Sequence, residues 1–262
     1  MANLVTLSEQ DLQPVNQYLE SRTPYEILEW SIKVFPRIGI LTSGQKAGSI
    51  LCKLVYKSGH KLDLVFSDTG VLFQETYDTM EQIRNSYGLP LKRYAPKLSM
   101  EEQTRLHGVL YISHAGQEKC CHMRKVEPLL DLHQDYDALL GPLRRGEGGA
   151  RSKVPIVSLD TSMKLIRINP MATISNEDYE TLALEQDTII NPLHEQGFPT
   201  IGCNRCTTPV RPDERPRAGR WRHLSGVDYC GINPTDVSHQ SQTIPLEEAI
   251  VLRLRHTVLS TI

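Results

Sequence analysis

Apolar residues fall into two kinds of run that alternate along most of the chain. Short runs that close on small or polar turn residues predict buried strands at 38–41, 62–66, 91–94, 154–159 and 165–168. Longer segments between them predict helices at 23–34, 48–55, 73–87 and 127–139. This alternation predicts an α/β fold with a mostly parallel sheet covered on both faces.

Capping residues mark several of the helix starts. Thr23–Glu26 combines an N-cap threonine, a proline at the first helical position and an acid at the third. Ser99 with Glu102, and Ser175 with Asp178, have the spacing of a side-chain cap. We therefore expect helices to begin at these three places.

Two strands end in turns that are suited to an anion. The strand 38–41 is followed by Ser43 and Gly44, and the strand 62–66 is followed by Asp68 and Thr69. A small-residue turn between a strand and a helix places backbone N–H groups at a phosphate, and ligands of open α/β sheets lie at the carboxyl ends of strands. Each turn taken alone is a weak signal, because such residues are also common in ordinary turns.

The character of the chain changes after about Gly197. Residues 200–233 are rich in Gly, Pro, Arg and Cys and predict an ordered loop region or tail around a site, and a final helix is expected at 245–259. We divide the chain into an α/β domain over 1–199 and a C-terminal segment over 200–262.

Composition and charge narrow the class of protein. Of the 262 residues, 39% are hydrophobic and 23% charged, with a formal net charge of −2, which is typical of a soluble globular chain. The charge gives no case for binding nucleic acid or an anionic membrane, and no apolar run approaches the roughly 20 residues of a membrane span. The N-terminal residues lack the pattern of a signal peptide, so we expect a cytoplasmic protein.

Five of the six cysteines lie at three places: the pair Cys120 and Cys121, the CxxC of Cys203 and Cys206, and Cys230. Six cysteines in a large cytosolic chain favour metal or redox chemistry over structural disulfides. Four thiolates fit an iron–sulfur cluster or a zinc ion, and a CxxC alone also fits a redox pair. The adjacent pair can also be two core thiols, although the charges that flank it make this less favourable.

Several segments resemble motifs of one family. Residues 120–129 (CCHMRKVEPL), 201–207 (IGCNRCT), 217–221 (RAGRW) and 230–232 (CGI) are similar, in this order, to motifs of the iron–sulfur adenylyl-sulfate (APS) reductases. Upstream, 67–70 and 75–77 resemble the family's stretch near the nucleotide, and Arg144, Arg145 and Arg151 its substrate loop. Residues 191–194 resemble the segment before the CxxC, so the resemblance spans 38–233.

This resemblance implies a Rossmann-like adenine-nucleotide fold of the PP-loop type with a C-terminal tail. It implies reduction of adenylyl sulfate, or of its 3′-phospho form, to sulfite and the adenine nucleotide, with a thioredoxin-like reductant. It also implies a [4Fe–4S] cluster on Cys120, Cys121, Cys203 and Cys206, with Cys230 as the nucleophile. We further expect a homo-oligomer and no nucleic-acid or membrane partner.

Candidate substrate-binding residues follow from the same motifs and from the chemistry of a sulfate carried on AMP. Guanidinium groups bind phosphate and sulfate oxygens bidentately, whereas most arginines in proteins are simply solvated. The expected residues are Ser43, Gly44, Asp68, Thr69, Lys125, Arg144, Arg151, Arg217 and Arg220.

The chain departs from the family pattern in places that matter for the substrate. The loop 43–48 (SGQKAG) lacks the acidic residues usual there, and Asp228-Tyr229 and Asn233 flank the Cys230 motif where other residues are typical. Alternatives are a 3′-phospho-specific reductase, an ATP-using PP-loop sulfur-transfer enzyme and a non-catalytic iron–sulfur redox protein. The second would want a Ser-Gly-Gly-x-Asp-Ser loop, which this chain lacks.

Overall fold

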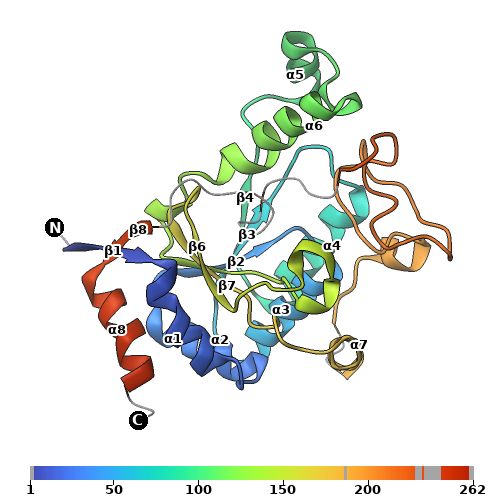
Figure 1. Ribbon diagram of the computed structural model, residues 1–262. Coiled ribbons are helices and arrows are strands. Elements are labelled where there is room, and N and C mark those ends of the chain that lie inside the picture. Colours follow the sequence, from blue (N-terminus) through green and yellow to red (C-terminus); the bar gives the residue numbers. More distant parts are fainter. Residues whose placement is uncertain (1–2, 186–187, 228–231, 233–242, 260–262) are drawn as a thin grey trace.

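The computed structural model describes residues 3–185, 188–227, 232 and 243–259 (Figure 1). Within them, six strands form a central sheet in the order β4-β3-β2-β5-β7-β6. Five of these strands are parallel, and β6 is antiparallel to β7. The strands are β2 (Ile38–Thr42), β3 (Asp63–Ser67), β4 (Leu91–Tyr94), β5 (Ala138–Leu140), β6 (Val157–Asp160) and β7 (Leu165–Ile168). The predicted α/β fold with a mostly parallel sheet is confirmed.

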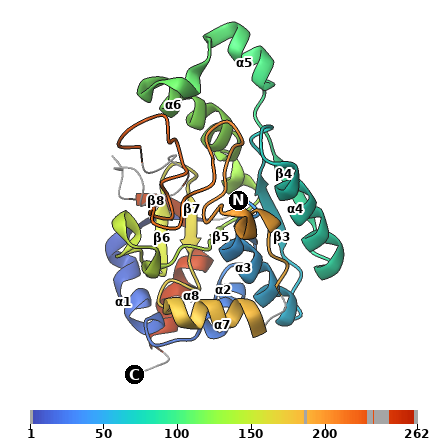
Figure 2. The ribbon, with the colours of Figure 1, turned by 90° about the vertical axis from the view of Figure 1, so that its right-hand side faces the viewer.

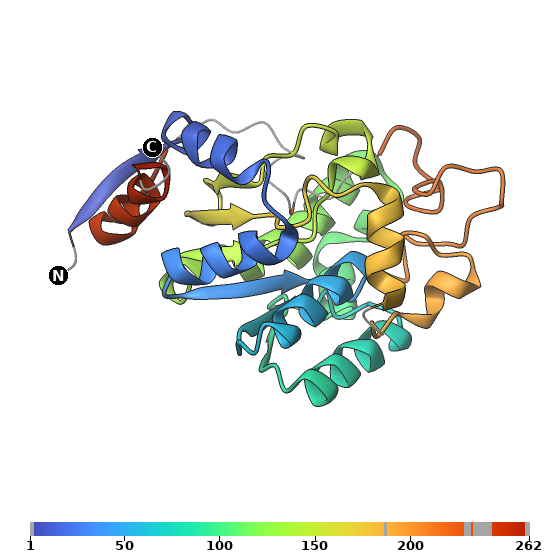
Figure 3. The same ribbon diagram turned by 90° about the horizontal axis from the view of Figure 1, so that it is seen from below.

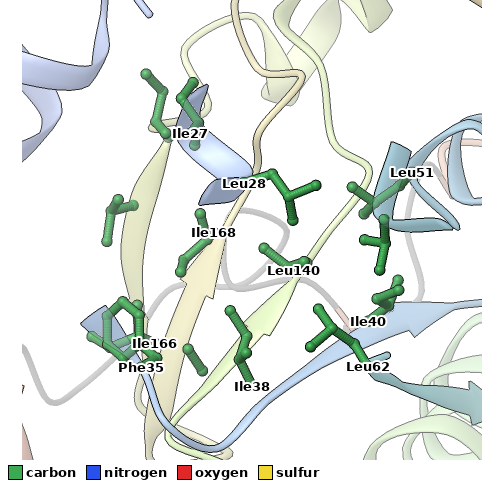
Figure 4. Packing of buried hydrophobic residues seen from close by; sticks show 14 of the residues in the cluster. Ile27, Leu28, Phe35, Ile38, Ile40, Leu51, Leu62, Leu140, Ile166 and Ile168 are labelled. Atoms are coloured by element: carbon green, nitrogen blue, oxygen red, sulfur yellow. The ribbon is translucent and has the colours of Figure 1, made fainter. Parts of the chain in front are cut away.

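Helices cover one face of this sheet. Ile27 and Leu28 of α2 (Pro24–Val34) and Leu51 of α3 (Lys46–Lys57) pack on Ile40, Leu140 and other strand residues (Figure 4). These five side chains are fully buried, and burying each contributes about 1.5–3 kcal/mol. The helices α1 (Glu9–Leu19), α4 (Gln74–Tyr87) and α7 (Asn176–Glu185) contribute to the same cluster.

The other face of the sheet is covered differently. Leu41, Val65 and Leu139 of the strands pack with Leu129 and Tyr136, which come from the segment between α6 (His114–Cys121) and β5. That segment is made of a π-helical stretch (His122–Val126) and two 3-10 turns (Glu127–Leu129 and Leu132–Gln134). Both faces are covered as predicted, but only one of them by α-helices.

The helix predicted at 127–139 is wrong. Pro128 cannot donate a helical hydrogen bond, and Ala138–Leu140 is buried throughout, as is typical of a central parallel strand. The same apolar residues therefore fit a strand that closes the gap between β2 and β7.

The final helix is shorter than predicted. Residues Thr243–Glu247 form β8, which pairs antiparallel with β1 (Leu4–Ser8), and α8 (Glu248–Leu259) begins after it. The buried positions of β8 alternate, which is the period of a strand. This two-stranded sheet and α8 lie at the end of the molecule that is remote from 200–227 (Figures 1 and 3).

An arm of two helices projects from the sheet beyond β4. It consists of α5 (Met100–His107) and α6, and the loops of 200–227 lie beside α6 (Figure 2). The capping box predicted from Ser99 and Glu102 starts α5, and the predicted capping residues also start α2 and α7. Across the described chain, no helix has the length and apolar character needed to cross a membrane.

Candidate functional site

The loop after β2 leads directly into α3. Gly44 has a φ of +71°, and a Cβ there would lie 2.8 Å from the Thr76 methyl group, so both the backbone and the space require glycine. Its N–H donates to the Thr42 hydroxyl, at 3.3 Å. Ser43 and Gly44 thus lie at the N-terminus of α3, where backbone N–H groups favour an anion.

The loop after β3 lies at the same edge of the sheet. The Asp68 carboxylate accepts from the Gly70 N–H and from the Tyr77 hydroxyl, both at 2.8 Å. Burial and the neighbouring Asp68 raise the pKa of Tyr77 to about 12. Thr69 accepts a hydrogen bond from the Cys203 thiol at 3.3 Å. Asp68 therefore stabilises the loop after β3, and Thr69 bonds this loop to the segment that carries Cys203.

The two cysteine pairs line one pocket. Cys120 and Cys121 come from the end of α6, and Cys203 and Cys206 come from the loop region after 200. We call this the cysteine pocket; none of its four thiols is in a disulfide within the described residues. Its lining also includes Met100, Tyr111, Gln117, Arg124, Lys125 and Trp221. The fold therefore brings together all four of the cysteines that were predicted as ligands.

Side-chain amides donate hydrogen bonds to two of these thiols, and burial raises the pKa of two of them. The Gln103 amide N–H donates to Cys120 Sγ at 3.4 Å, and the Gln117 amide donates to Cys121 Sγ at 3.2 Å. Burial raises the pKa of Cys120, and burial together with the adjacent Cys203 raises the pKa of Cys206 to about 12. Without a bound cation, burial favours the neutral thiols of Cys120 and Cys206, and metal binding would release their protons.

Buried cations surround the pocket. Arg124 donates to the Thr69 carbonyl at 2.7 Å and to the Gln103 amide oxygen at 3.1 Å. Lys125 Nζ lies 5.9 Å from the Trp221 ring centroid, and the Arg220 guanidinium lies 4.4 Å from the same centroid. Of the predicted substrate residues, Lys125 and Arg220 are thus brought to the cysteine pocket.

Trp221 carries an unused donor in this pocket. Its side chain is 1% exposed, and no hydrogen-bond acceptor within the described residues reaches its indole N–H. Its φ of +48° is rare for a residue other than glycine. A buried donor of this kind is costly unless a further group accepts from it.

The other predicted arginines lie elsewhere. Arg144 follows β5 and is buried; its guanidinium lies 3.5 Å from the Tyr179 ring centroid and donates to Asn176. Arg151 pairs with Glu147 in a short 3-10 turn. Arg217 lies in the 200–227 loops, where its carbonyl accepts from the Arg220 N–H. None of these three lines the cysteine pocket as the structure describes it.

Cys230 lies outside the described residues, and its role as nucleophile stays a prediction. Ile232, two positions on, packs against the apolar cluster on the second face of the sheet, which includes Leu41, Val65 and Leu139. Among the described side chains, no group of three or more His, Cys, Asp or Glu is arranged to hold a metal ion. The cluster therefore also stays a prediction.

Sequence reasoning missed Arg124, Gln45, Asn191 and His194 as parts of the site. Arg124 was noted only as a flanking charge, and 191–194 only as a resembling segment. Each of the four has a hydrogen-bond partner more than 50 positions away in the chain, and no local pattern signals such a partner.

Comparisons with known proteins agree with this geometry. A family model described as "Phosphoadenosine phosphosulfate reductase domain" matches residues 37–209. The chain is similar to adenosine 5′-phosphosulfate reductase 1 of Bacillus subtilis, at 35% identity over 71% of this chain and 79% of the relative. It is also similar to the adenosine 5′-phosphosulfate reductase of Mycolicibacterium smegmatis, at 30% identity over 89% of this chain and 99% of the relative.

Solved structures give the same fold. A phosphoadenylyl-sulfate (PAPS) reductase from Candida auris, in a phosphate complex, superposes with a TM-score of 0.67 and 25% identity, covering 78% of this chain and 99% of that one. An FMN adenylyltransferase from Candida glabrata superposes with a TM-score of 0.51 at 15% identity, covering 94% and 80%, and shows the fold alone.

Proposed function

The chain belongs to the phosphoadenosine phosphosulfate reductase family, and on that premise we propose that it reduces adenylyl sulfate to sulfite and AMP in sulfate assimilation. It is an oxidoreductase that acts on a sulfur group. The observation that carries the proposal is the cysteine pocket, which gathers four cysteines from two distant segments beside the loops after β2 and β3. The 3′-phospho form is the alternative substrate.

The choice of adenylyl sulfate rests on the relatives. Two curated relatives at 30–35% identity are named for adenosine 5′-phosphosulfate, whereas the Candida auris protein, named for the 3′-phospho form, is 25% identical. The two cysteine pairs point the same way through the resemblance described above.

We propose that Cys120, Cys121, Cys203 and Cys206 hold a [4Fe–4S] cluster. The donor set is four thiols, which suits iron–sulfur chemistry. The buried Trp221 N–H lacks an acceptor in the described protein, and buried Arg124 and Lys125 would balance thiolate charge. When bound, the cluster would organise charge near the sulfate and pass no electrons to it.

The reaction itself needs a nucleophile and a dithiol. The Cys230 thiolate attacks the sulfate sulfur, a sulfur–sulfur bond forms, and the bond from sulfur to the AMP phosphate oxygen breaks with its electron pair leaving on AMP. One thiol of a thioredoxin-like dithiol then attacks the Cys230 sulfur, which releases sulfite and forms a mixed disulfide. The second thiol of the dithiol attacks this mixed disulfide, which restores the Cys230 thiol and leaves the dithiol oxidised to a disulfide. The dithiol supplies the two electrons.

The chain's other residues hold the anion during this attack. Backbone N–H groups at the start of α3, other than that of Lys46, which donates to His194, are proposed to face the phosphate. Lys125 and Arg220 bring positive charge to the cysteine pocket. Arg144, Arg151 and Arg217 are proposed to contact the substrate from the surrounding loops.

The test uses the purified protein without reductant. We incubate it with adenylyl sulfate or the 3′-phospho form and look by mass spectrometry for a sulfonate adduct. An adduct on Cys230 is expected with adenylyl sulfate. It should vanish in Cys230→Ser and persist in the control Cys52→Ser, whose thiol is buried in the core with a pKa raised to about 12. Absence of an adduct with both nucleotides would overturn the proposal.

The cluster has its own test. We expect a brown protein with the absorption near ~400 nm of an iron–sulfur chromophore, since zinc is colourless. A colourless protein that contains zinc would overturn the cluster and leave the nucleophile in place.

The remaining parts of the proposal concern the setting of the enzyme. We propose a cytoplasmic location, a thioredoxin-like partner and a homo-oligomer. The division into 1–199 and 200–262 is likewise a proposal; the second segment supplies the CxxC, the RxGRW run and Cys230 to the site of the first.

A further inference from the structure

The residues at the start of α3 are held by the chain that leads into the CxxC. We call Ser43–Lys46 the phosphate loop and Asn191–Ile201 the lead segment. Three hydrogen bonds join them: Asn191 Nδ2 to the Gly44 carbonyl at 3.3 Å, the Lys46 N–H to His194 Nε2 at 3.1 Å, and the Ile201 N–H to Gln45 Oε1 at 3.0 Å. Three consecutive loop residues are thus tied to one segment.

Gln45 makes the contact nearest the cysteines. Ile201 lies two positions before Cys203 and is 2% exposed. Its carbonyl accepts from Arg220 Nη1 at 3.3 Å, and Arg220 in turn lies against Trp221 of the cysteine pocket. The backbone of Ile201 therefore connects Gln45 on one side with the cysteine pocket on the other.

The Gln45 side chain does not cap the helix at whose N-terminus it lies. Gln45 occupies the N-cap of α3, yet it makes no side-chain capping bond to that helix. A residue at an N-cap ordinarily satisfies a helix N–H itself. Here the Gln45 oxygen accepts from Ile201, and the first N–H of α3 is satisfied by His194.

The lead segment is itself firmly anchored, so it can transmit a displacement. Asn191 is fully buried, and its amide group donates to Thr76 as well as to Gly44 and accepts from the Leu193 N–H. Beyond Ile201, the Cys203 thiol donates to Thr69 in the loop after β3. A movement at the phosphate loop therefore has a continuous hydrogen-bonded route to the CxxC.

We propose that Gln45 is a positioning residue that couples nucleotide binding at the phosphate loop to the conformation of the CxxC segment. The inference rests on the proposed function, since the nucleotide is the ligand that would occupy the loop. Coupling of binding to conformation is reciprocal, so whatever orders the CxxC segment also strengthens nucleotide binding. Gln45 lies in the part of the loop where this chain departs from the family pattern.

The experiment follows amide exchange in the lead segment and the CxxC with AMP as the probe. Hydrogen exchange of 199–206 is measured with and without AMP in the wild type, in Gln45→Met and in Gln74→Met. Methionine keeps the length of glutamine and removes the acceptor. Gln74 is the matched control, because its amide donates to the exposed Asp78 on α4, which belongs neither to the phosphate loop nor to the lead segment. Calorimetry gives the AMP affinity of each protein.

In the wild type and in Gln74→Met we expect AMP to slow exchange of 199–206 by about tenfold. In Gln45→Met we expect less than about twofold slowing and an AMP affinity lower by about fivefold, the effect of losing one hydrogen bond. Gln45→Glu restores an acceptor oxygen and should restore the protection of 199–206, even though its charge weakens AMP binding. Gln45→Ala removes the same acceptor with a smaller side chain and must reproduce the loss.

The outcomes separate the two claims. If the wild type binds AMP and Gln45→Met and Gln45→Ala keep full protection of 199–206, the coupling is overturned and the proposed function stands. If the wild type binds neither AMP nor adenylyl sulfate, the proposed function and the coupling fall together. Equal loss of protection in Gln74→Met would also overturn the specific role of Gln45.

Discussion

The sheet core and the cysteine pocket are built by different means. The core joins apolar residues of neighbouring strands and helices, such as Ile40, Leu140 and Ile166, none of which is solvent-exposed (Figure 4). The pocket joins cysteines from two distant segments and encloses charged side chains such as Arg124. An apolar side chain in a core can pack against many other apolar side chains, whereas a buried charge or thiol needs a specific bonding partner. Changes in the core should therefore alter stability, and changes in the pocket should alter chemistry.

The strongest test of this contrast is Cys203→Ser. We expect bound iron to fall from about four per chain to less than about one, and sulfite production to fall by more than about 100-fold, since a proposed ligand is lost. Iron analysis and a sulfite assay measure both. Cys52→Ser, at a cysteine of α3 outside the pocket, should keep its iron. Full iron content in Cys203→Ser would show that this residue is not a ligand.

Leu140→Ala probes the other region. It removes a fully buried side chain from β5, and we expect the free energy of unfolding to fall by about 2–5 kcal/mol. The Tm should fall by roughly 5–15 °C, which calorimetry measures. Iron per folded chain should stay unchanged. A loss of iron at full stability would contradict the separation of core and pocket.

Arg124→Met tests the border between the two regions. It leaves the buried Thr69 carbonyl and the Gln103 amide oxygen without this donor, which should cost about 1–3 kcal/mol of stability. Arg93→Met, at a partly exposed arginine paired with Glu81, should change stability by less than about 0.5 kcal/mol. Denaturant unfolding measures the stability of both variants. Equal losses of stability would show that the hydrogen bonds of Arg124 do not stabilise this part of the protein.

The mildest change concerns pH and His194. Burial, and then the adjacent Lys46, lowers the pKa of His194 below its ordinary 6.5, in keeping with an Nε2 that accepts from the Lys46 N–H. Well above pH 6.5 neither the folded nor the unfolded state binds this proton. As the pH falls below 6.5, the unfolded state binds it first, so stability declines from 6.5 downward to the lowered pKa.

His194→Gln keeps an acceptor and cannot titrate. We therefore expect its Tm to decline less than that of the wild type between about pH 7 and pH 5. Parallel curves for the two proteins would show that His194 does not contribute to the acid sensitivity.

Local patterns predicted much of the sheet domain. The strands β2, β3 and β4 and the starts of α2 and α5 follow from short apolar runs and capping residues, which act over four or five positions. The segment 127–139 failed because a short apolar run fits a helix or a buried strand equally well. Ala138–Leu140 forms a strand because it lies between β2 and β7 in the sheet, and no local pattern encodes that position.

The sequence by itself determined which residues are predicted to carry the chemistry: the two cysteine pairs, Cys230 and the turns after two strands. Only the tertiary structure decided that the pairs share one pocket, that Trp221 brings a buried donor to it, and that Gln45 meets Ile201. The physical reason is the range of the interactions. Caps and periodicity act between near neighbours, whereas the bonds of Cys203 to Thr69 and of Ile201 to Gln45 join residues 134 and 156 positions apart, which only the path of the whole chain brings within reach.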